Sequence, residues 1–288
     1  MGIGKASMTK LLWITDPHLN FLRDASAVQI FGSYLNEEQE FDAVVITGDI
    51  AEAPSVKPLL ESFARGINKN IYFVLGNHDY YRGSIATVHE SIRSLTQTKL
   101  TWLDDAKSPI LLDETTALVG QGGWYDGRLG NPIKSRVVMS DFELIKDFRP
   151  HFHYRQWVDY EDRGDLLSVL RSMSKKQADD AHKKLHAAAN IRKDIIFATH
   201  YPPFGGACWH EGALSDSDWM PWFTSFSMGE MLAEVALDFP ENRFTVLCGH
   251  THSPGTYEHL PNLRVLTGKS VYGAPDIAGV LELPMQWR

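Results

Sequence analysis

Five short apolar runs, rich in β-branched residues, recur along this chain and have the pattern of buried strands. Each has a length typical of a strand rather than of a helix. The runs cover residues 11–15, 43–47, 71–75, 195–199 and 244–248. Apolar residues recur with helical spacing over residues 25–38, 56–67 and 84–95. Strands that alternate with helices in this way predict a parallel sheet with right-handed crossovers.

Further short strand patterns predict a second, partly antiparallel sheet. They cover residues 110–112, 117–120, 255–259, 264–267 and 279–283. Two segments, residues 127–192 and 201–227, do not belong to this alternating core and are interpreted as insertions. Residues 165–189 of the first predict a long helix with an apolar stripe on one face. The second is rich in Trp and Phe, and it fits either a substrate lid or a satellite core over the sheet edge.

Polar clusters follow each of the five main strands. The sequences are Asp16-Pro17-His18, Gly48-Asp49, Gly76-Asn77-His78-Asp79, His200 and Gly249-His250-Thr251-His252. In an open α/β sheet, ligands bind beyond the carboxyl ends of the strands, so residues in these clusters are expected to meet in space. The doublets at 16/18 and 250/252 are two residues apart, a spacing that lets both side chains point the same way in an extended backbone.

The residue types in these clusters are metal ligands. Seven candidates supply oxygen or imidazole donors: Asp16, His18, Asp49, Asn77, His200, His250 and His252. Without thiolates, this set suits Mn, Fe, Zn, Ni or Co. Seven donors are enough for two divalent or trivalent metal ions, and a two-metal site is typical of hydrolysis at phosphorus.

Each cluster also has an ordinary structural interpretation. A single histidine such as His18 or His200 is more often packed than metal-bound, and Gly48-Asp49 or Gly76-Asn77 alone is a common turn signal. Five clusters in order, each after a predicted strand, favour the metal site. Because its ligands run from residue 16 to residue 252, any division of the chain would split it. We therefore expect one domain over residues 1–288.

The order D-x-H, G-D, G-N-H-D, a single H and G-H-x-H resembles the calcineurin-like metallophosphoesterases over residues 16–252. The resemblance implies an α/β fold, a four-layer α/β/β/α sandwich with an inserted helical and loop segment. It also implies one metal bound by Asp16, His18 and His252, a second bound by Asn77, His200 and His250, Asp49 as the bridge, and His78 as a catalytic residue.

The expected mechanism is attack by a hydroxide held between the two metals, with His78 as the general acid that protonates the leaving oxygen. Asp79, or a carboxylate elsewhere, could orient the His78 ring. The second block continues Ile50-Ala51-Glu52-Ala53 and lacks the arginine of the protein Ser/Thr phosphatases. Dephosphorylation of phosphoproteins is therefore disfavoured.

Charge narrows the choice of substrate. The formal net charge of −8 disfavours binding to long nucleic acid. We expect a small phosphomonoester or phosphodiester, with a nucleotide as one candidate. A metal-dependent nuclease and a non-catalytic protein-binding scaffold are the alternatives. The oligomeric state is left open.

Several weaker signals complete the analysis. His182 and His186 are four residues apart on the predicted helix, but the intervening lysines favour a solvated face over a metal site. His151 and His153 lie in a stretch that looks extended and could line the pocket. Residues 1–7 lack the apolar core of a signal peptide, and no apolar run reaches transmembrane length. A cytoplasmic protein that does not bind a membrane is the expectation.

Overall fold

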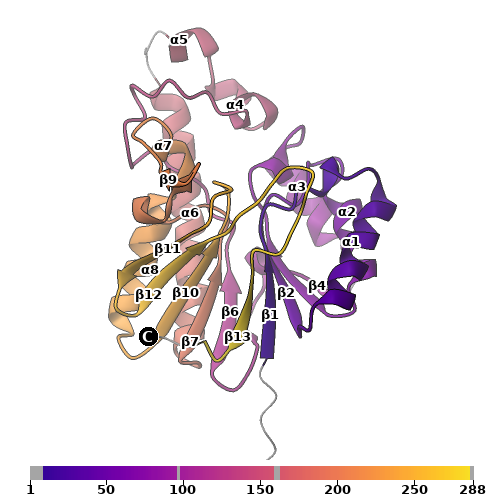
Figure 1. Cartoon of the computed structure of the whole chain (residues 1–288). Coiled ribbons are helices and arrows are strands. Elements are labelled where there is room, and N and C mark those ends of the chain that lie inside the picture. Colours follow the sequence, from indigo (N-terminus) through magenta and orange to yellow (C-terminus); the bar gives the residue numbers. More distant parts are fainter. Residues whose placement is uncertain (1–8, 96–97, 159–162, 286–288) are drawn as a thin grey trace, which may run out of the picture.

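Two β-sheets lie face to face at the centre of the molecule, and helices cover their outer faces (Figure 1). The structure is a computed structural model that describes residues 9–95, 98–158 and 163–285. Residues 1–7, on which the expectation about a signal peptide rested, lie outside the described part of the chain.

The first sheet has the order β13-β1-β2-β3-β4. Its strands are β1 (Thr9–Ile14), β2 (Ala43–Thr47), β3 (Asn70–Val74), β4 (Leu100–Trp102) and β13 (Gly279–Leu283). The strands β1 to β4 pair in parallel, as the alternating pattern predicts. Every residue of β2 is buried, which is typical of a strand covered on both faces.

The second sheet has the order β11-β12-β10-β7-β6-β5. Its strands are β5 (Ile110–Leu111), β6 (Thr116–Gly120), β7 (Asp194–Ala198), β10 (Arg243–Cys248), β11 (Gly255–Leu260) and β12 (Leu263–Thr267). The inner four are parallel, and the two edge strands β5 and β11 are antiparallel to their neighbours. A separate pair, β8 (Trp209–His210) with β9 (Ala213–Leu214), lies in the 201–227 segment.

Eight α-helices occur in the described residues. They are α1 (Ala25–Glu38), α2 (Val56–Gly66), α3 (Ile85–Arg93), α4 (Asp141–Leu144), α5 (Tyr154–Val158), α6 (Gly164–Ala189), α7 (Met220–Phe223) and α8 (Phe226–Asp238). In Figure 1, α1 and α2 flank the first sheet, while α6 and α8 flank the second. None of these helices combines the length and apolar character needed to cross a membrane.

Three apolar cores correspond to the three interfaces between four layers. Successive side chains of a strand point to opposite faces of the sheet and therefore enter different cores. Leu12 and Val44 pack outward under α1 and α2, whereas their neighbours Leu11 and Val45 pack between the sheets against Leu118 and Leu247 of the second sheet. The third core joins the outer face of the second sheet to α6 and α8. The expected four-layer α/β/β/α architecture is thereby confirmed.

Two local expectations are wrong. Strand β13 joins the first sheet, antiparallel to β1, and not the second sheet. Its Leu281 and Leu283 enter the core between the sheets, and their alternating pattern would suit an edge of either sheet. The stretch around His151 and His153 is not extended, because a 3-10 helix covers Arg149–His151 and α5 begins at Tyr154. The fixed φ of Pro150 favours such a helical first turn.

Candidate metal centre

The carboxyl ends of five strands from both sheets converge on one site. The loops after β1, β2 and β3 come from the first sheet, and those after β7 and β10 from the second. Backbone hydrogen bonds tie neighbouring loops together. The N–H of Asp16 donates to the carbonyl of Gly48, and the N–H of Gly249 donates to the carbonyl of His200. All seven predicted ligands lie in these loops.

The first group of potential donors contains Asp16, His18, Asp49 and His252. The Nε2 atoms of His18 and His252 are 3.2 Å apart. Nε2 of His252 lies 3.6 Å from Oδ1 of Asp16, and Nε2 of His18 lies 3.9 Å from Oδ2 of Asp49. Four donor atoms thus surround one small space that is large enough for a cation.

The second group contains Asp49, His200 and His250, and Asn77 completes it. Oδ1 of Asn77 lies 3.0 Å from Nε2 of His200 and 3.1 Å from Nδ1 of His250. Oδ1 of Asp49 is 3.4 Å from Nε2 of His200. Asp49 therefore faces both groups, one through each carboxylate oxygen, and has the position that a bridging ligand requires.

Backbone carbonyls fix the tautomers of two rings. Nδ1 of His200 lies 2.9 Å from the carbonyl oxygen of Thr47, and Nε2 of His250 lies 3.1 Å from that of Trp222. A carbonyl only accepts, so these ring nitrogens carry the protons. The opposite nitrogens then present lone pairs to the centre, the arrangement usual for metal-bound histidines.

The site contains several buried carboxylates, and bound cations would neutralise them. Asp16, Asp49, Asp79 and Asp141 are all buried. None of the ion pairs found among the described residues joins Asp16 or Asp49 to a lysine or arginine. Burial raises the pKa of Asp16, and it raises that of Asp49 well above its usual range, with a further contribution from Asp16. Bound metal ions would supply the missing positive charge.

Burial has the opposite effect on the histidines. It lowers the pKa of His18 to about 2 and that of His200 to about 3, because a charged ring is disfavoured away from water. These rings are therefore neutral at ordinary pH and need lose no proton to bind a metal. The chemistry of the donor set fits two divalent cations.

Glycines leave the space that the ligands occupy. A Cβ on Gly76 would lie 2.2 Å from Oδ1 of Asp49, and one on Gly249 would lie 2.0 Å from Oδ2 of Asp16. A Cβ on Gly48 would lie 2.5 Å from Nδ1 of His200. The glycine in each of the three blocks is thus a steric requirement of the neighbouring ligand.

Five of the seven candidate ligands have a left-handed backbone. Their φ angles are 45° at Asp16, 41° at His18, 51° at Asp49, 68° at His250 and 57° at His252. This conformation costs an L-residue roughly 1–2 kcal/mol. The sharp turns aim both members of each doublet at the centre, which is a different geometry from the extended one used in the sequence analysis.

The two candidate catalytic residues occupy different surroundings. The side chain of His78 is 20% exposed, and its Nε2 lies 3.9 Å from Oδ2 of Asp49. Asp79 is fully buried, and its oxygens accept backbone N–H groups of Ala51 and Gly76, each at 2.8 Å. These two hydrogen bonds of Asp79 hold the loops after β2 and β3 together.

A pocket of about 330 Å³ opens above the centre. Asp49, Asn77, His78, His250 and His252 form its floor. The walls come from both insertions (Val138, Met139, Ser140, His210, Trp219 and Phe223), from the loops after β3 and β10 (Tyr81 and Thr251) and from the loop before β13 (Tyr272). Among the described residues, none of those that line the pocket is a lysine or an arginine.

The two interpretations of the Trp-rich segment each describe part of it. Trp222 is fully buried and packs with Tyr125, Phe142 and Trp157, as a satellite core would. Trp219 is 37% exposed, stacks on Phe223 and lines the pocket, as a lid would.

Other weaker candidates lie elsewhere. Nδ1 of His151 pairs with Asp165 at 2.7 Å, and neither His151 nor His153 is among the residues that line the pocket. His182 and His186 stack with ring centroids 5.9 Å apart on α6. His186 is exposed and close to Asn190, in keeping with the expected solvated face.

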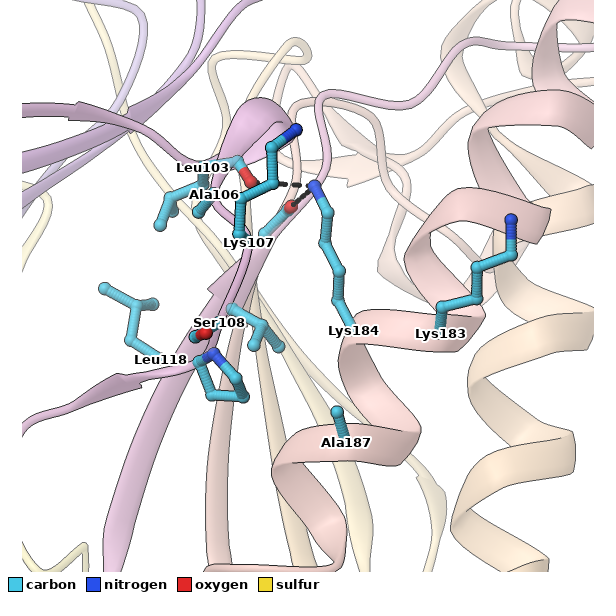
Figure 2. A pocket seen from close by; sticks show the side chains of 11 residues that line it. Leu103, Ala106, Lys107, Ser108, Leu118, Lys183, Lys184 and Ala187 are labelled. Carbon is cyan, nitrogen blue, oxygen red and sulfur yellow. Dashed lines mark hydrogen bonds between the residues drawn. The ribbon is translucent and has the colours of Figure 1, made fainter.

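A second cavity, of about 120 Å³, is lined by residues of α6, of β6 and of the segment 103–109 between β4 and β5 (Figure 2). The ammonium of Lys184 donates to the carbonyl oxygens of Leu103 and Gly120 at 2.7 and 3.2 Å, and to Oε1 of Gln121 at 2.9 Å. These hydrogen bonds satisfy the Lys184 ammonium and hold α6 against the second sheet. None of the candidate ligands lines this cavity.

Sequence reasoning missed several residues of the site. Asp141 bonds to Asn77, Tyr81 and Tyr125, and Tyr272 lies over His18 with ring centroids 4.3 Å apart. Neither belongs to a recognisable motif. An aspartate in a stretch of ordinary composition and a tyrosine in a loop gave no signal, because only the fold brings them to the centre.

Comparison with known proteins agrees with this geometry. The model of the calcineurin-like phosphoesterase family matches residues 9–254. The 3′,5′-cyclic adenosine monophosphate phosphodiesterase of Haemophilus influenzae is 32% identical over 82 residues, which are 25% of this chain and 30% of that protein. The chain thus matches less than a third of the length of this curated relative.

Two solved structures share the fold. The phosphopantetheinyl hydrolase of Mycobacterium tuberculosis has a TM-score of 0.61 at 16% identity, covering 93% of this chain and 92% of that chain. A dimetal phosphatase from Danio rerio has a TM-score of 0.58 at 14% identity, covering 96% and 92%. The family match over residues 9–254 shows that the chain belongs to the calcineurin-like phosphoesterase family, and the shared fold and the donor groups agree with it.

Proposed function

We propose that this protein hydrolyses a small phosphodiester with two divalent metal ions and with His78 as the proton donor. The observation that carries the proposal is the pair of donor groups that share Asp49 beneath an open pocket. Asp16, His18 and His252 would hold one ion, and Asn77, His200 and His250 the other. When bound, the ions supply positive charge for the phosphoryl oxygens and lower the pKa of water.

His78 lies where a leaving group would depart. Its ring is partly exposed on the pocket floor, and its backbone N–H donates to Oδ1 of Asp49 at 2.9 Å. Burial, with a smaller contribution from His252, lowers the pKa of His78 to about 3, so the free ring is neutral. We propose that the ring takes up a second proton when the anionic substrate lies beside it, gives its Nε2 proton to the leaving oxygen and is left as neutral imidazole.

Asp49 and Asp79 take different supporting roles in this proposal. Asp49 accepts the backbone N–H of His78 at 2.9 Å and so fixes the segment that carries the ring. Asp79 fixes the loops after β2 and β3 through its two backbone hydrogen bonds. Asp79 would then act on the site through loop geometry, without touching substrate.

The residues that line the pocket support a phosphodiester substrate over a phosphomonoester. A phosphomonoester carries one more negative charge than a diester at neutral pH, and the part of the pocket lining that the structure describes offers it no lysine or arginine. The stretch of similarity to a cyclic nucleotide phosphodiesterase supports the same choice. The exposed ring of Trp219 gives a surface on which a flat group of the substrate, such as a base, could stack.

The alternatives are less well supported. A nuclease for long polymers would meet a chain with a net charge of −8. A non-catalytic scaffold would have no need for two complete donor groups beneath a pocket.

Hydrolysis of bis-p-nitrophenyl phosphate and of p-nitrophenyl phosphate tests the proposal. Metal-stripped protein would be supplied with Mn²⁺, Zn²⁺ or Ni²⁺, and Asp49→Asn would be compared with Asp113→Asn, a change in the turn before β6. We expect a higher kcat/KM for the diester, loss of turnover in Asp49→Asn and retention in Asp113→Asn. A higher kcat/KM for the monoester would refute the diester assignment, and metal-independent turnover would refute the mechanism.

A further inference from the structure

A buried carboxylate from the insertion 127–192 contacts the Asn77 side chain of the metal centre. Asp141 is the first residue of α4 and is fully buried. We propose that Asp141 is a positioning residue that fixes both the Asn77 ligand and the ring on which His78 rests. This inference rests on the metal centre of the proposed function and is independent of the choice of substrate.

The contact with Asn77 sets the direction of its amide. Nδ2 of Asn77 donates to Oδ1 of Asp141 at 2.9 Å and to the hydroxyl of Tyr81 at 3.2 Å. An ionised carboxylate only accepts, so the NH2 group must face Asp141. The amide oxygen is then directed to the opposite side, toward His200 and His250. Without Asp141, the Asn77 amide would lose the acceptor that favours this orientation over the one with its oxygen and nitrogen exchanged.

The same carboxylate holds Tyr81. The Tyr81 hydroxyl donates to Oδ1 of Asp141 at 2.6 Å. The Tyr81 ring stacks on His78, with centroids 4.2 Å apart and an interplanar angle of 29°. Asp141 thus fixes the surface that limits rotation of the His78 imidazole. Oδ2 accepts the hydroxyl of Tyr125 at 2.9 Å, so both oxygens of Asp141 are engaged by side-chain donors.

The location of Asp141 links the pocket wall to the centre. Val138, Met139 and Ser140, which precede it directly, line the pocket. A single short stretch of the insertion therefore forms part of the substrate wall and also holds a ligand from 64 residues earlier in the chain. The insertion is accordingly a required part of the metal centre.

The test is metal binding by Asp141→Asn, measured by calorimetric titration of stripped protein with Mn²⁺ in the absence of substrate. An asparagine side chain has one acceptor oxygen and a donor NH2, so it cannot accept from Asn77 and from both tyrosines. We expect the affinity for one of the two ions to fall about 10- to 100-fold, as for loss of groups that orient metal ligands, while the other ion binds normally.

Asp147→Asn is the matched control. Asp147 belongs to the same insertion and also contacts the segment after β3, but it accepts the backbone N–H of Ile85 at 2.9 Å. We expect this variant to bind both ions like the wild-type protein. If Asp141→Asn fails to fold, Tyr125→Phe removes one donor from Oδ2 and should weaken the same ion to a smaller extent.

Two outcomes would overturn the inference. If the folded Asp141→Asn variant, or Tyr125→Phe in its place, binds both ions with wild-type affinity and only melts at a lower temperature, Asp141 has a purely structural role. Wild-type protein that binds two ions in that experiment leaves the proposed centre intact, so the inference alone fails. Wild-type protein that binds fewer than two would contradict the proposed centre, and the inference with it.

Discussion

Replacing Gly76 with alanine should empty the metal centre while the fold persists. Gly76 is not among the residues with positive φ, so its backbone can accommodate alanine. The obstacle is steric. The new Cβ would lie 2.2 Å from Oδ1 of Asp49 and 2.6 Å from Cε1 of His200, whereas contacts shorter than 3.0 Å are essentially never found.

The size of the effect follows from these distances. Asp49 Oδ1 must retreat by at least 0.8 Å, the difference between 3.0 and 2.2 Å. Metal–ligand distances tolerate only about 0.2 Å, and Asp49 faces both donor groups. We therefore expect loss of both ions. Because a misplacement of about 1 Å can lower a rate about 100-fold, kcat/KM for the diester should fall at least that far.

Metal content after dialysis, diester hydrolysis and circular dichroism would be measured on Gly76→Ala and on Gly279→Ala. The latter is the control, because the nearest atom to its new Cβ is Cε3 of Trp13 at an ordinary 3.5 Å. A Gly76→Ala protein that holds two ions and turns over the diester normally would refute the reasoning.

Three further predictions concern the centre and its pocket. His78→Ala should keep both ions and slow alkyl leaving groups by about 100-fold or more, but slow p-nitrophenolate less; equal losses across a leaving-group series would contradict its role as proton donor. Trp219→Ala should remove about 1–3 kcal/mol of stacking and raise KM for thymidine 5′-p-nitrophenyl phosphate about 5-fold or more. KM for methyl p-nitrophenyl phosphate should change little, and equal changes would argue against stacking. Mn²⁺ affinity should still rise with pH above the ordinary range of an aspartate pKa, because burial raises the pKa of Asp16 and Asp49 and a proton held by the free carboxylates must leave when the ion binds. A calorimetric Kd that does not vary with pH, and no proton release, would refute this assignment.

Most residues of the site could be predicted from the sequence, because each candidate ligand follows a short apolar run that is readily recognised as a strand. The runs at 43–47 and 244–248 correspond to β2 and β10, and Asp49 and His250 come directly after them. Ligands bind beyond the carboxyl ends of parallel strands, so these patterns predicted which residues meet. The division of the strands between two sheets, with β2 in the first and β10 in the second, depends on packing that no local pattern shows.

The remaining residues could not be predicted, since their roles arise from long-range packing. Asp141 reaches Asn77 across 64 positions, and Trp222 acts on His250 through a backbone carbonyl that any residue would supply. Strand β13 has an alternating pattern that suits an edge of either sheet. Helix α4, with four residues, is too short for periodicity to reveal.

At the candidate ligands with positive φ, the residue that would make the backbone more stable differs from the residue that binds metal. Glycine adopts the φ of His18 or His252 without the penalty that histidine incurs, so such a replacement would relieve strain and delete a donor in a single step. Laboratory evolution of thermostable variants, screened only for soluble expression in metal-poor medium, should accumulate substitutions at these positions first. A chain that keeps histidine at both positions therefore retains two nitrogen donors at a cost in backbone energy.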